Sequence, residues 1–390
     1  MRRKNKKGAY GLSVLAVLGI MAIIFMFQMF HEAEAAKKLD NTAKWQKDHS
    51  PRSIDVSGKT FIQTIKLGAI GDILIHDTVY EDAFTNSGYD FKPMLSNVKD
   101  YLLEPDLLLA NQETILGGID LGLSSYPMFN SPVEVGDALI DAGVDIVSNA
   151  NNHSLDKAEK GVLKSISYME TAGLPYVGSF KNPEDQRRLR VLNKNGIKVA
   201  FLSYTYGTNG IPVPKGKDHL VNLIDHSLMQ AEIKRAKEQS DIVVMSIHWG
   251  NEYQRFPTVD QEELAQFLVD EGVDIIFGHH PHVLQPMEWL EAQDGRKAFV
   301  VYSLGNFLSG QMWDYKDIGG LATIAITKQI TTAGTQTTLA NPGFLPTFVS
   351  SSRQSSYRVV PLREAGKYGL ANPENKYIEI MNHMTQFIKE

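Results

Sequence analysis

The sequence predicts an α/β fold, in which short buried strands alternate with amphipathic helices from about residue 61 onward. Two observations lead to this class. Short runs rich in Val, Ile and Leu recur, bounded by glycine or polar residues, which is typical of buried strands. Longer segments whose apolar residues lie three and four positions apart separate these runs, which is typical of helices.

The individual elements follow from these patterns. Strands are predicted at Thr64–Ile70, Leu107–Ala110, Ile146–Ser148, Val199–Ser203, Ile242–Ile247, Ile275–Phe277 and Ala298–Tyr302. Helices are predicted at Val133–Ala142, Lys157–Ala172, Ser227–Gln239 and Val259–Glu271. Three of these helices are followed directly by a glycine, which is favoured just past a helix end: Gly143, Gly173 and Gly272.

The C-terminal part is predicted to be mostly β-structure. A hairpin is expected within Val283–Val301, because Asp294-Gly295 is a common two-residue turn between strands. More strands are expected toward Val360, with a loop or hairpin tip at Thr331–Thr338 and a last helix at Asn375–Lys389. The periodicity is compatible with a layered αββα body and with a three-layer body, and it does not choose between them.

Composition excludes several classes of function. The chain has 390 residues, of which 43% are hydrophobic and 22% charged, as in an ordinary folded protein. A net charge of −6 argues against general nucleic-acid binding. The absence of cysteine excludes disulfides, cysteine-based metal sites and thiol nucleophiles.

The N-terminal sequence predicts a membrane anchor. A basic segment, Met1–Lys7, precedes the uncharged apolar stretch Ala9–Phe30, which is long enough to cross a bilayer core of roughly 30 Å as a helix. Because the basic flank stays inside, the rest of the chain is expected outside the cell membrane, held by a single span. A cleaved signal peptide is the alternative, because Ala33-Glu34-Ala35 resembles a cleavage site.

The chain is therefore expected to have consecutive parts with different roles. A stalk is predicted after the anchor because that segment is polar, mixed in charge and without periodicity. The parts are a cytoplasmic basic tail (1–8), a transmembrane anchor (9–30), a stalk (31–60), the main domain (61–365) and a C-terminal helical extension (366–390).

Polar residues follow the predicted strands, at the edge of an α/β sheet where ligands bind. The densest group is Gly278–His282, in which three histidines lie close together although the chain has only 11. The strand-end segments are Gly71-Asp72, Asn111-Gln112-Glu113, Asn149-Ala150-Asn151-Asn152-His153 with Asp156, His248-Trp249-Gly250-Asn251-Glu252, Gly278-His279-His280-Pro281-His282 and Ser303-Leu304-Gly305-Asn306.

Each of these segments also has a structural explanation when taken alone. Asp72 suits a turn or helix cap, the asparagines suit turns, and a lone histidine such as His153 is often structural. Together they predict one shared polar site. Carboxylate, imidazole and amide ligands without sulfur suit Mn, Fe, Zn or Mg. The set exceeds what one tetrahedral ion needs, and two ions sharing a carboxylate would use it all.

These segments, in this order and spacing, resemble the CapA family of poly-γ-glutamate capsule biosynthesis proteins, from about Phe61 to beyond Gly310. The resemblance implies a calcineurin-like metallophosphoesterase fold, a four-layer αββα sandwich with two divalent metal ions, Mn, Fe or Zn. It implies that the first ion is bound by Asp72 and His282, that Glu113 bridges, and that the second ion is bound by Asn152, His248 and His280.

The resemblance also implies roles for neighbouring residues. His153 would be the general acid and Asp156 its orienting partner. Residues expected beside the ligands or in contact with substrate are His76, Asn149, Glu252, Gly305, Asn306 and His279, for which a simply exposed position is the alternative. The sequence departs from the phosphoesterase pattern where Leu74 stands in place of a histidine, with His76 two positions later, and where Glu113 stands in place of a bridging aspartate.

The resemblance implies a role in making or exporting poly-γ-glutamate beside a membrane ligase or export subunits. A metal-dependent hydrolase or transferase is the favoured hypothesis. Two alternatives stay open: a non-catalytic subunit that binds polymer or a partner enzyme, and a general surface metallophosphodiesterase.

Overall fold

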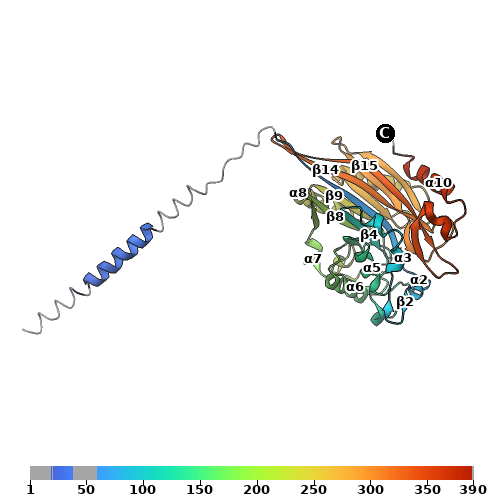
Figure 1. Cartoon of the computed structure of the whole chain (residues 1–390), viewed down its shortest axis with the longest axis horizontal. Coiled ribbons are helices and arrows are strands. Elements are labelled where there is room, and N and C mark those ends of the chain that lie inside the picture. The colour runs from blue at the N-terminus through green and yellow to red at the C-terminus, as the bar shows by residue number, and fades with distance from the viewer. Residues whose placement is uncertain (1–18, 20, 38–58, 389–390) are drawn as a thin grey trace, which may run out of the picture. The chain divides into compact units, whose positions relative to one another are not determined.

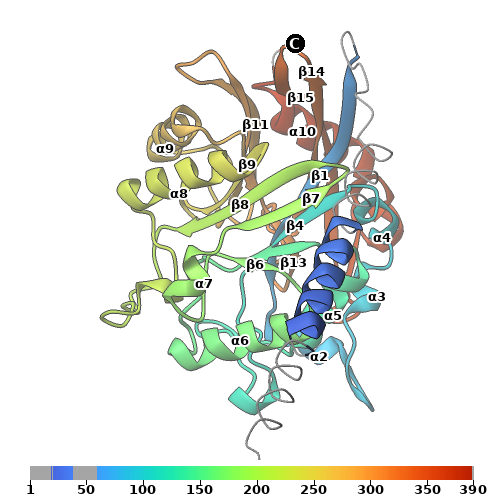
Figure 2. The ribbon, with the colours of Figure 1, turned by 90° about the vertical axis from the view of Figure 1, so that its left-hand side faces the viewer.

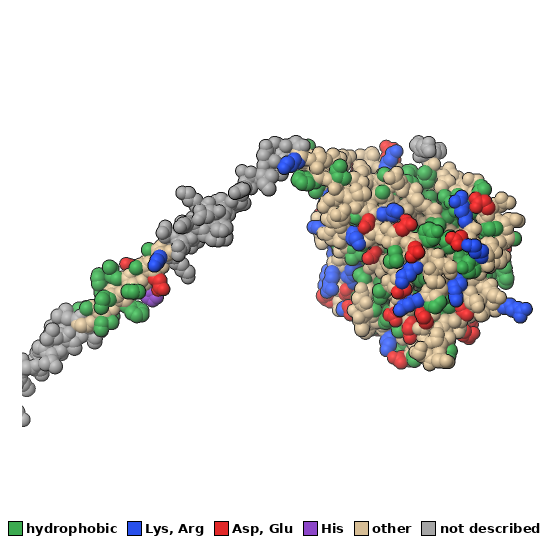
Figure 3. Space-filling model, viewed as in Figure 1, with side chains coloured by type: hydrophobic (Ala, Val, Ile, Leu, Met, Phe, Trp, Pro, Cys, Tyr) green, Lys and Arg blue, Asp and Glu red, His purple; other side chains and the backbone are tan. Residues whose placement is uncertain are grey.

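The computed structural model describes residues 19, 21–37 and 59–388, and the chain divides into two units, Met1–Lys59 and Thr60–Glu390. In the first unit, residues 19 and 21–37 are helical and expose large apolar side chains, drawn green in Figure 3. The predicted basic tail, half of the predicted anchor (9–18 and 20) and most of the predicted stalk lie outside the described residues.

Among the residues that the structure describes, no helix combines the length and the apolar character that a membrane crossing requires.

The larger unit contains two main sheets. The strands of the first are Phe61–Leu74 (β1), Leu107–Gln112 (β4), Ile146–Ser148 (β5), Tyr176–Val177 (β6), Asn306–Ser309 (β13), Ile318–Thr331 (β14), Gly334–Ser350 (β15) and Arg358–Pro361 (β16). Their order is β16-β15-β14-β1-β4-β5-β6, with β13 beside β1. The long strands β14 and β15 run side by side in Figure 1.

The strands of the second sheet are Arg190–Lys194 (β7), Ile197–Thr205 (β8), Ile242–His248 (β9), Ile275–His279 (β10), Leu284–Glu291 (β11) and Lys297–Leu304 (β12). Their order is β11-β12-β10-β9-β8-β7. Each sheet contains a group of adjacent parallel strands: β1, β4, β5 and β6 in the first, and β8, β9, β10 and β12 in the second. Both sheets therefore present several carboxyl ends at one edge.

The remaining elements are short strands and helices. The strands Phe84–Thr85 (β2) and Gly88–Tyr89 (β3) form a small separate hairpin. The α-helices are Asp77–Asp82 (α2), Lys92–Leu95 (α3), Lys99–Leu102 (α4), Glu134–Asp141 (α5), Ala158–Ala172 (α6), Pro183–Arg187 (α7), His226–Gln239 (α8), Val259–Glu271 (α9) and Pro373–Thr385 (α10). Short 3₁₀ helices span Ile119–Leu121, Asp218–Leu220 and Leu362–Tyr368.

The core lies between the sheets and beneath the helices. Alternate residues of β10 divide between two apolar clusters: Phe277 packs with first-sheet residues such as Leu109, whereas Ile276 packs with Ile233 of α8 and Leu268 of α9. This alternation is the strand period of two, with both faces buried. In Figure 2, α8 and α9 lie on one side of the strands and α3 to α5 on the other.

The larger unit is a mixed α/β fold, as the sequence predicts. The predicted strand Ile146–Ser148 and helix Val259–Glu271 have the predicted bounds. Most other predicted strands are longer by one to four residues at an end, because the sheet extends into the polar segments that follow the apolar runs. The last helix spans Pro373–Thr385 rather than Asn375–Lys389, and it packs against β11 and β15.

Charged side chains of both signs are interspersed on the face of the larger unit that Figure 3 shows. This distribution accords with the modest net charge of −6.

Candidate metal centre

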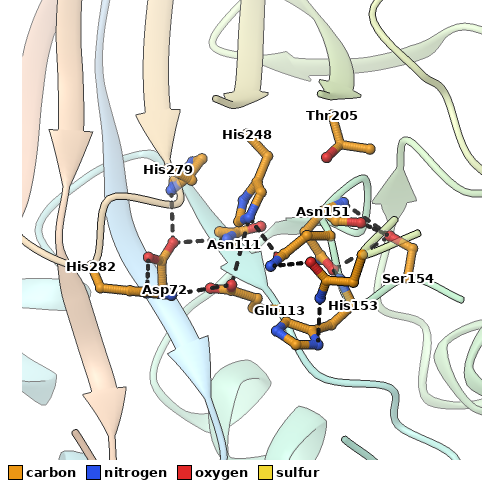
Figure 4. Close-up of polar contacts among 12 residues, drawn as sticks. Asp72, Asn111, Glu113, Asn151, His153, Ser154, Thr205, His248, His279 and His282 are labelled. Carbon is orange, nitrogen blue, oxygen red and sulfur yellow. Dashed lines mark hydrogen bonds and ion pairs between the residues drawn. The ribbon is translucent and has the colours of Figure 1, made fainter. Parts of the chain in front are cut away.

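The site lies where the carboxyl ends of strands from both sheets meet. Asp72 comes from β1 of the first sheet and His248 from β9 of the second, while Glu113 follows β4. His279 ends β10, and the loop after it brings His282 back toward Asp72. All of these side chains are buried and point toward one another in Figure 4. The two-sheet arrangement therefore gathers residues that lie up to 210 positions apart in the chain.

Gly71 makes the close approach beside Asp72. The Asp72 amide donates to the Gly305 carbonyl oxygen at 2.9 Å. A Cβ atom at position 71 would lie 1.9 Å from that oxygen, closer than any real contact. Gly305 itself has a φ of 63°, which favours glycine because it lacks Cβ.

We therefore predict that Gly71→Ala destabilises the larger unit by on the order of 3 kcal/mol through overpacking against backbone. The free energy of unfolding, from urea denaturation of the metal-free chain, measures this. Gly207→Ala is the matched control, since a Cβ there meets nothing within 4 Å and its expected change is small. Equal denaturation midpoints for the two variants would contradict the expectation.

Asp72 is held by three side chains. Asn111 Nδ2 donates to its Oδ1 at 2.8 Å, and His282 Nδ1 lies 3.2 Å from its Oδ2. His279 Nδ1 lies 3.5 Å from Oδ1. Burial by itself raises the pKa of Asp72, but the adjacent imidazoles of His279 and His282 outweigh it and hold that pKa well below its usual range. Asp72 is therefore a carboxylate, the form that binds cations.

Glu113 is the least satisfied group of the site. It is buried, and neither carboxyl oxygen has a hydrogen-bond partner among the residues that the structure describes. Its Oε1 lies 3.5 Å from His248 Nε2 and 3.8 Å from His282 Nε2. Burial and the charge of Asp72 raise the pKa of Glu113 well above its usual value. Leaving such a group unpaired costs free energy unless something else compensates it.

Two groups of side chains in the site have the arrangement of metal ligands. One is Glu113 with His280 and His282, and the other is Asp72 with Glu113 and His248. In each group the ligand atoms lie within 4.8 Å of one another. Glu113 belongs to both groups, as a carboxylate shared by two ions requires. The pairing differs from the family assignment, because Asp72 groups with His248 and His280 with His282.

The donors fit divalent cations. Like the carboxyl oxygens of Glu113, several buried imidazole nitrogens have no hydrogen-bond partner in the described part of the chain. They are His248 Nδ1, both ring nitrogens of His279, and His280 Nδ1. Burial lowers the pKa of His248 well below its usual value and that of His280 to about 3. Neutral imidazoles and carboxylates without sulfur suit Mn, Fe and Zn.

Backbone strain marks the histidine loop. His280 and His282 have φ values of 97° and 58°, in the left-handed region that non-glycine residues rarely adopt. Such strain, of order 1–3 kcal/mol per residue, concentrates at functional sites. In this conformation the ring centroids of His280 and His248 lie 4.8 Å apart. His248 Nε2 in turn lies 2.9 Å from Asn152 Oδ1, so the predicted ligands Asn152, His248 and His280 are neighbours.

A histidine–aspartate pair lies beside this cluster. His153 Nδ1 lies 2.7 Å from Asp156 Oδ2, which also accepts from the Phe129 amide at 2.6 Å. The Phe129 ring meets the His153 ring edge-on at 4.7 Å. Both residues of the pair are buried, and the carboxylate fixes the ring orientation. The two residues lie three positions apart, within the turn at residues 151–157 that brings their side chains together.

Three of the other predicted neighbours lie beside the ligands, namely Gly305, Asn306 and His279, whereas His76 contacts Gly310 and Phe129. Asn306 Oδ1 lies 3.1 Å from His282 Nδ1, and Gly305 contacts Asp72, so both lie beside the ligands. His279, for which an exposed position was the alternative, is buried against Asp72, so that alternative is wrong. His76 Nδ1 accepts from the Gly310 amide at 3.2 Å, and its ring packs edge-on against Phe129.

One predicted contact needs correction. Asn149 points away from the ligands, because its Nδ2 donates to Met169 Sδ at 3.4 Å, and its backbone oxygen accepts from Ser154 and Ser179. Its position in the asparagine-rich segment fixes where its backbone lies but not where its side chain points. Glu252 is exposed and makes no hydrogen bond to the ligands in the described structure, but its charge contributes to the raised pKa of Glu113, so its predicted place near substrate stays a prediction.

Several supporting residues were not predicted. Asn111 orients Asp72 and accepts from Ser148 Oγ at 3.0 Å. Asn151 Nδ2 donates to the Gln112 carbonyl oxygen, and its Oδ1 accepts from the His153 amide. Both belong to the asparagine-rich strand-end segments, so the position of those segments was the available signal.

Comparisons with known proteins agree on the family. The family model described as bacterial capsule synthesis protein PGA_cap matches residues 66–311. Capsule biosynthesis protein CapA of Bacillus anthracis is 36% identical over 181 residues, covering 45% of this chain and 43% of that protein. PGA biosynthesis protein CapA of Bacillus subtilis (strain 168) is 34% identical over 177 residues, covering 45% of each. The chain thus matches less than half the length of these curated relatives.

One solved structure illustrates the remaining likeness. A 5'-nucleotidase precursor from Thermus thermophilus aligns with a TM-score of 0.42 and 14% identity, covering 82% of this chain and 60% of that one. A likeness this distant carries no argument about activity. The family match spans most of the larger unit and includes the candidate ligands from Asp72 to His282. This chain belongs to the family of bacterial capsule synthesis proteins, PGA_cap, as its resemblance to the CapA proteins predicts.

Proposed function

We propose that this protein acts in the synthesis or export of poly-γ-glutamate, and that its buried cluster is a two-metal centre for hydrolysis or transfer on that polymer. The names of the relatives support the polymer, and the cluster supports the chemistry. The observation that carries the proposal is Glu113: a buried carboxyl group without a partner in the described structure, shared by two sets of ligand atoms.

Asp72, Glu113, Asn152, His248, His280 and His282 would hold two ions, Mn, Fe or Zn. Such paired ions, when bound, supply a hydroxide nucleophile near neutral pH and stabilise developing negative charge on oxygen. The chain's own groups do the rest. Asn111 and His279 fix the direction of the Asp72 carboxylate. The deep burial of the cluster limits the water around the reacting bond.

His153 would supply the proton to the leaving group. Its Nδ1 is occupied by Asp156, so proton transfer uses Nε2. The Asp156 carboxylate accepts from Nδ1, which holds the ring so that Nε2 transfers the proton, and its second contact, from the Phe129 amide, keeps it in place.

We predict that Asp156→Asn lowers the turnover rate roughly a hundredfold, the low end of what general acid catalysis contributes. An amide at this position can also donate to the ring, so the variant no longer holds the His153 tautomer that proton transfer through Nε2 requires. Turnover and metal content of the purified chain are measured together. Unchanged turnover, or loss of metal in parallel with turnover, would show that Asp156 does not act through His153.

A separate set of observations, at the N-terminus, concerns the location of the protein. We propose that Ala9–Phe30 anchors the chain in the cell membrane by a single span, with the larger unit outside the cytoplasm. Supporting this are the uncharged apolar run, the basic residues before it, and the exposed apolar side chains of helical residues 21–30. Membrane ligase or export subunits of a capsule complex would be its partners there.

A binding role without turnover is the second candidate, and one observation favours it. Leu74 stands where the phosphoesterase pattern has a histidine, and His76 nearby is engaged by the Gly310 amide and the Phe129 ring. Incubation of the metal-loaded, full-length chain with γ-linked glutamate polymer distinguishes the candidates. Shortening or transfer of the polymer supports the enzyme, and retained binding without either supports the binding role. Cleavage of aryl phosphodiesters alone would instead indicate a general phosphodiesterase.

A further inference from the structure

Exposed aromatic rings cover the imidazoles of the candidate metal centre. Tyr206 is 48% exposed; its ring stacks on His248 at 6.3 Å and tilts over His280 at 4.6 Å. Tyr253 is 49% exposed and lies over His282 at 6.1 Å. These rings form a mouth above the ligands, and much of their apolar area remains open to solvent.

A strained loop that contacts Tyr253 carries a third exposed ring. Trp313, Asp314 and Tyr315 have φ values of 60°, 51° and 67°, three successive left-handed residues, where non-glycine residues normally occur singly. The turn is held by hydrogen bonds from the Lys316 amide to the Trp313 oxygen, and from the Trp313 amide to Asp317 Oδ2. Trp313 is nevertheless 74% exposed, so the strained turn does not serve to bury it.

This loop, residues 310–317, is fixed directly to the metal centre. Asn306, which contacts His282, donates through Nδ2 to the Lys316 oxygen at 2.9 Å and to Gln311 Oε1 at 3.1 Å. Gln311 in turn donates to the Tyr253 hydroxyl at 3.5 Å. The loop that carries Trp313 is therefore held by Asn306, the same side chain that contacts His282.

The opposite side of the loop is fixed to α10. The Tyr315 hydroxyl donates to Glu379 Oε1 at 2.6 Å, while Arg255 lies over the Tyr315 ring at 3.8 Å and Lys376 at 4.5 Å. These contacts hold the Tyr315 side chain against α10, whereas the Trp313 side chain stays exposed to solvent. Strain that surrounding contacts enforce at the edge of a site is a feature of ligand-binding loops.

A cation completes the arrangement. Lys316 Nζ lies over the Tyr253 ring at 5.2 Å, and its nearest carboxylate is that of the exposed Asp314, at 3.6 Å. An ammonium group beside open aromatic faces suits a ligand that has both planar groups and carboxylates. Neutral sugars also stack on aromatic rings, but they offer the ammonium group only hydroxyl acceptors and no opposite charge.

We propose that Tyr206, Tyr253, Trp313 and Lys316 form a binding subsite for an extended chain of planar amides that carry carboxylates, of which a γ-glutamyl chain is one. The amide planes stack on the rings, a carboxylate pairs with Lys316, and the chain leads into the metal centre. This inference rests on the proposed function and specifies how its polymer is held.

The test measures binding of a short γ-linked glutamate oligomer to the full-length chain, kept metal-free with a chelator and followed by calorimetry. Trp313→Ala is expected to weaken binding about tenfold, the loss of one stacked ring. Lys316→Met is expected to weaken it about threefold and to reduce its dependence on salt. Phe61→Ala is the matched control, because Phe61 is an exposed aromatic residue at the opposite end of β1 from Asp72.

The outcomes separate this inference from the proposed function. Equal affinities for wild type and Trp313→Ala, or no binding by wild type, would overturn the subsite. Trp313-dependent binding of a neutral oligosaccharide in preference to the glutamate oligomer would overturn the ligand class. Glu113→Gln is expected to retain oligomer binding while losing metal. If wild type binds the oligomer through Trp313 but binds no metal, the subsite stands and the two-metal function fails.

Discussion

Replacing Glu113 with glutamine is expected to abolish the thermal stabilisation that divalent metal gives to this protein. Because Glu113 belongs to both ligand groups, its loss removes a donor from each ion. Metal at about 100 times its dissociation constant stabilises a folded protein by about 2.7 kcal/mol, and the variant is expected to lose most of that gain. Polymer processing is expected to disappear with it.

The metal-free variant should be at least as stable as wild type, and the difference should depend on pH. Burial and the charge of Asp72 raise the pKa of Glu113 above its ordinary value of 4.5. A raised pKa means that the folded state binds the proton more tightly than the unfolded state. The stability that this proton provides is present below pH 4.5 and lost as pH rises through the folded-state pKa. A glutamine at position 113 does not titrate, so the variant does not lose stability in this way as pH rises.

Thermal unfolding of both proteins, with and without metal over a series of pH values, measures both effects. Glu291→Gln is the matched control, because Glu291 is an exposed glutamate at the end of β11, and it should behave as wild type. Equal stabilisation of wild type and Glu113→Gln by metal would show that Glu113 is not a ligand. A Glu113→Gln protein that is destabilised without metal would show that Glu113 has a partner which the geometry does not include.

Replacing His153 with glutamine is expected to lower turnover by roughly 10²- to 10⁴-fold, the usual contribution of a general acid. His153 is absent from both ligand groups and pairs with Asp156 instead, so metal binding should persist. The loss should be smallest for substrates whose leaving group needs no proton. Turnover of paired substrates with good and poor leaving groups, at full metal loading, measures this.

His226→Gln is the matched control for that experiment, because His226 lies on α8 and stacks on Phe267. Its turnover should equal that of wild type. A His153→Gln variant with equal losses on good and poor leaving groups would contradict the general-acid role. Loss of metal from it would make His153 a ligand or a support for one.

The candidate ligands could be predicted because each follows an apolar run. Asp72 and His248 lie at the ends of β1 and β9, and Glu113 directly follows β4. Parallel strands bring their carboxyl ends to one edge, so position in the sequence implies position in space. The assignment of each strand to one of the two sheets depends on pairing between distant segments. Local sequence patterns therefore do not predict it.

Side-chain direction was harder to predict. The strand β10 extends to His279, two residues beyond the predicted end at Phe277. Because side chains alternate along a strand, His279 points to the same side as Phe277, toward the core between the sheets. The correct strand length would have predicted its burial. The direction of Asn149 depends on a turn, where no such alternation applies.

The aromatic mouth could not be predicted from periodicity. Tyr206, Tyr253 and Trp313 lie in irregular segments, and their positions depend on strained backbone and on contacts such as that between Tyr315 and α10. The helices α2 to α4 were also missed, because helices this short contain too few residues for a 3.6-residue period to appear.

The measurement that tests the central claim most directly is the metal content of the purified full-length chain, by mass spectrometry, after reconstitution with Mn, Fe or Zn. The account predicts two ions per chain in wild type, as the overlapping ligand groups around Glu113 imply, and fewer in Glu113→Gln. Absence of bound metal from wild type under all of these conditions would contradict it, and would leave a protein that binds its polymer or partner without metal-dependent chemistry.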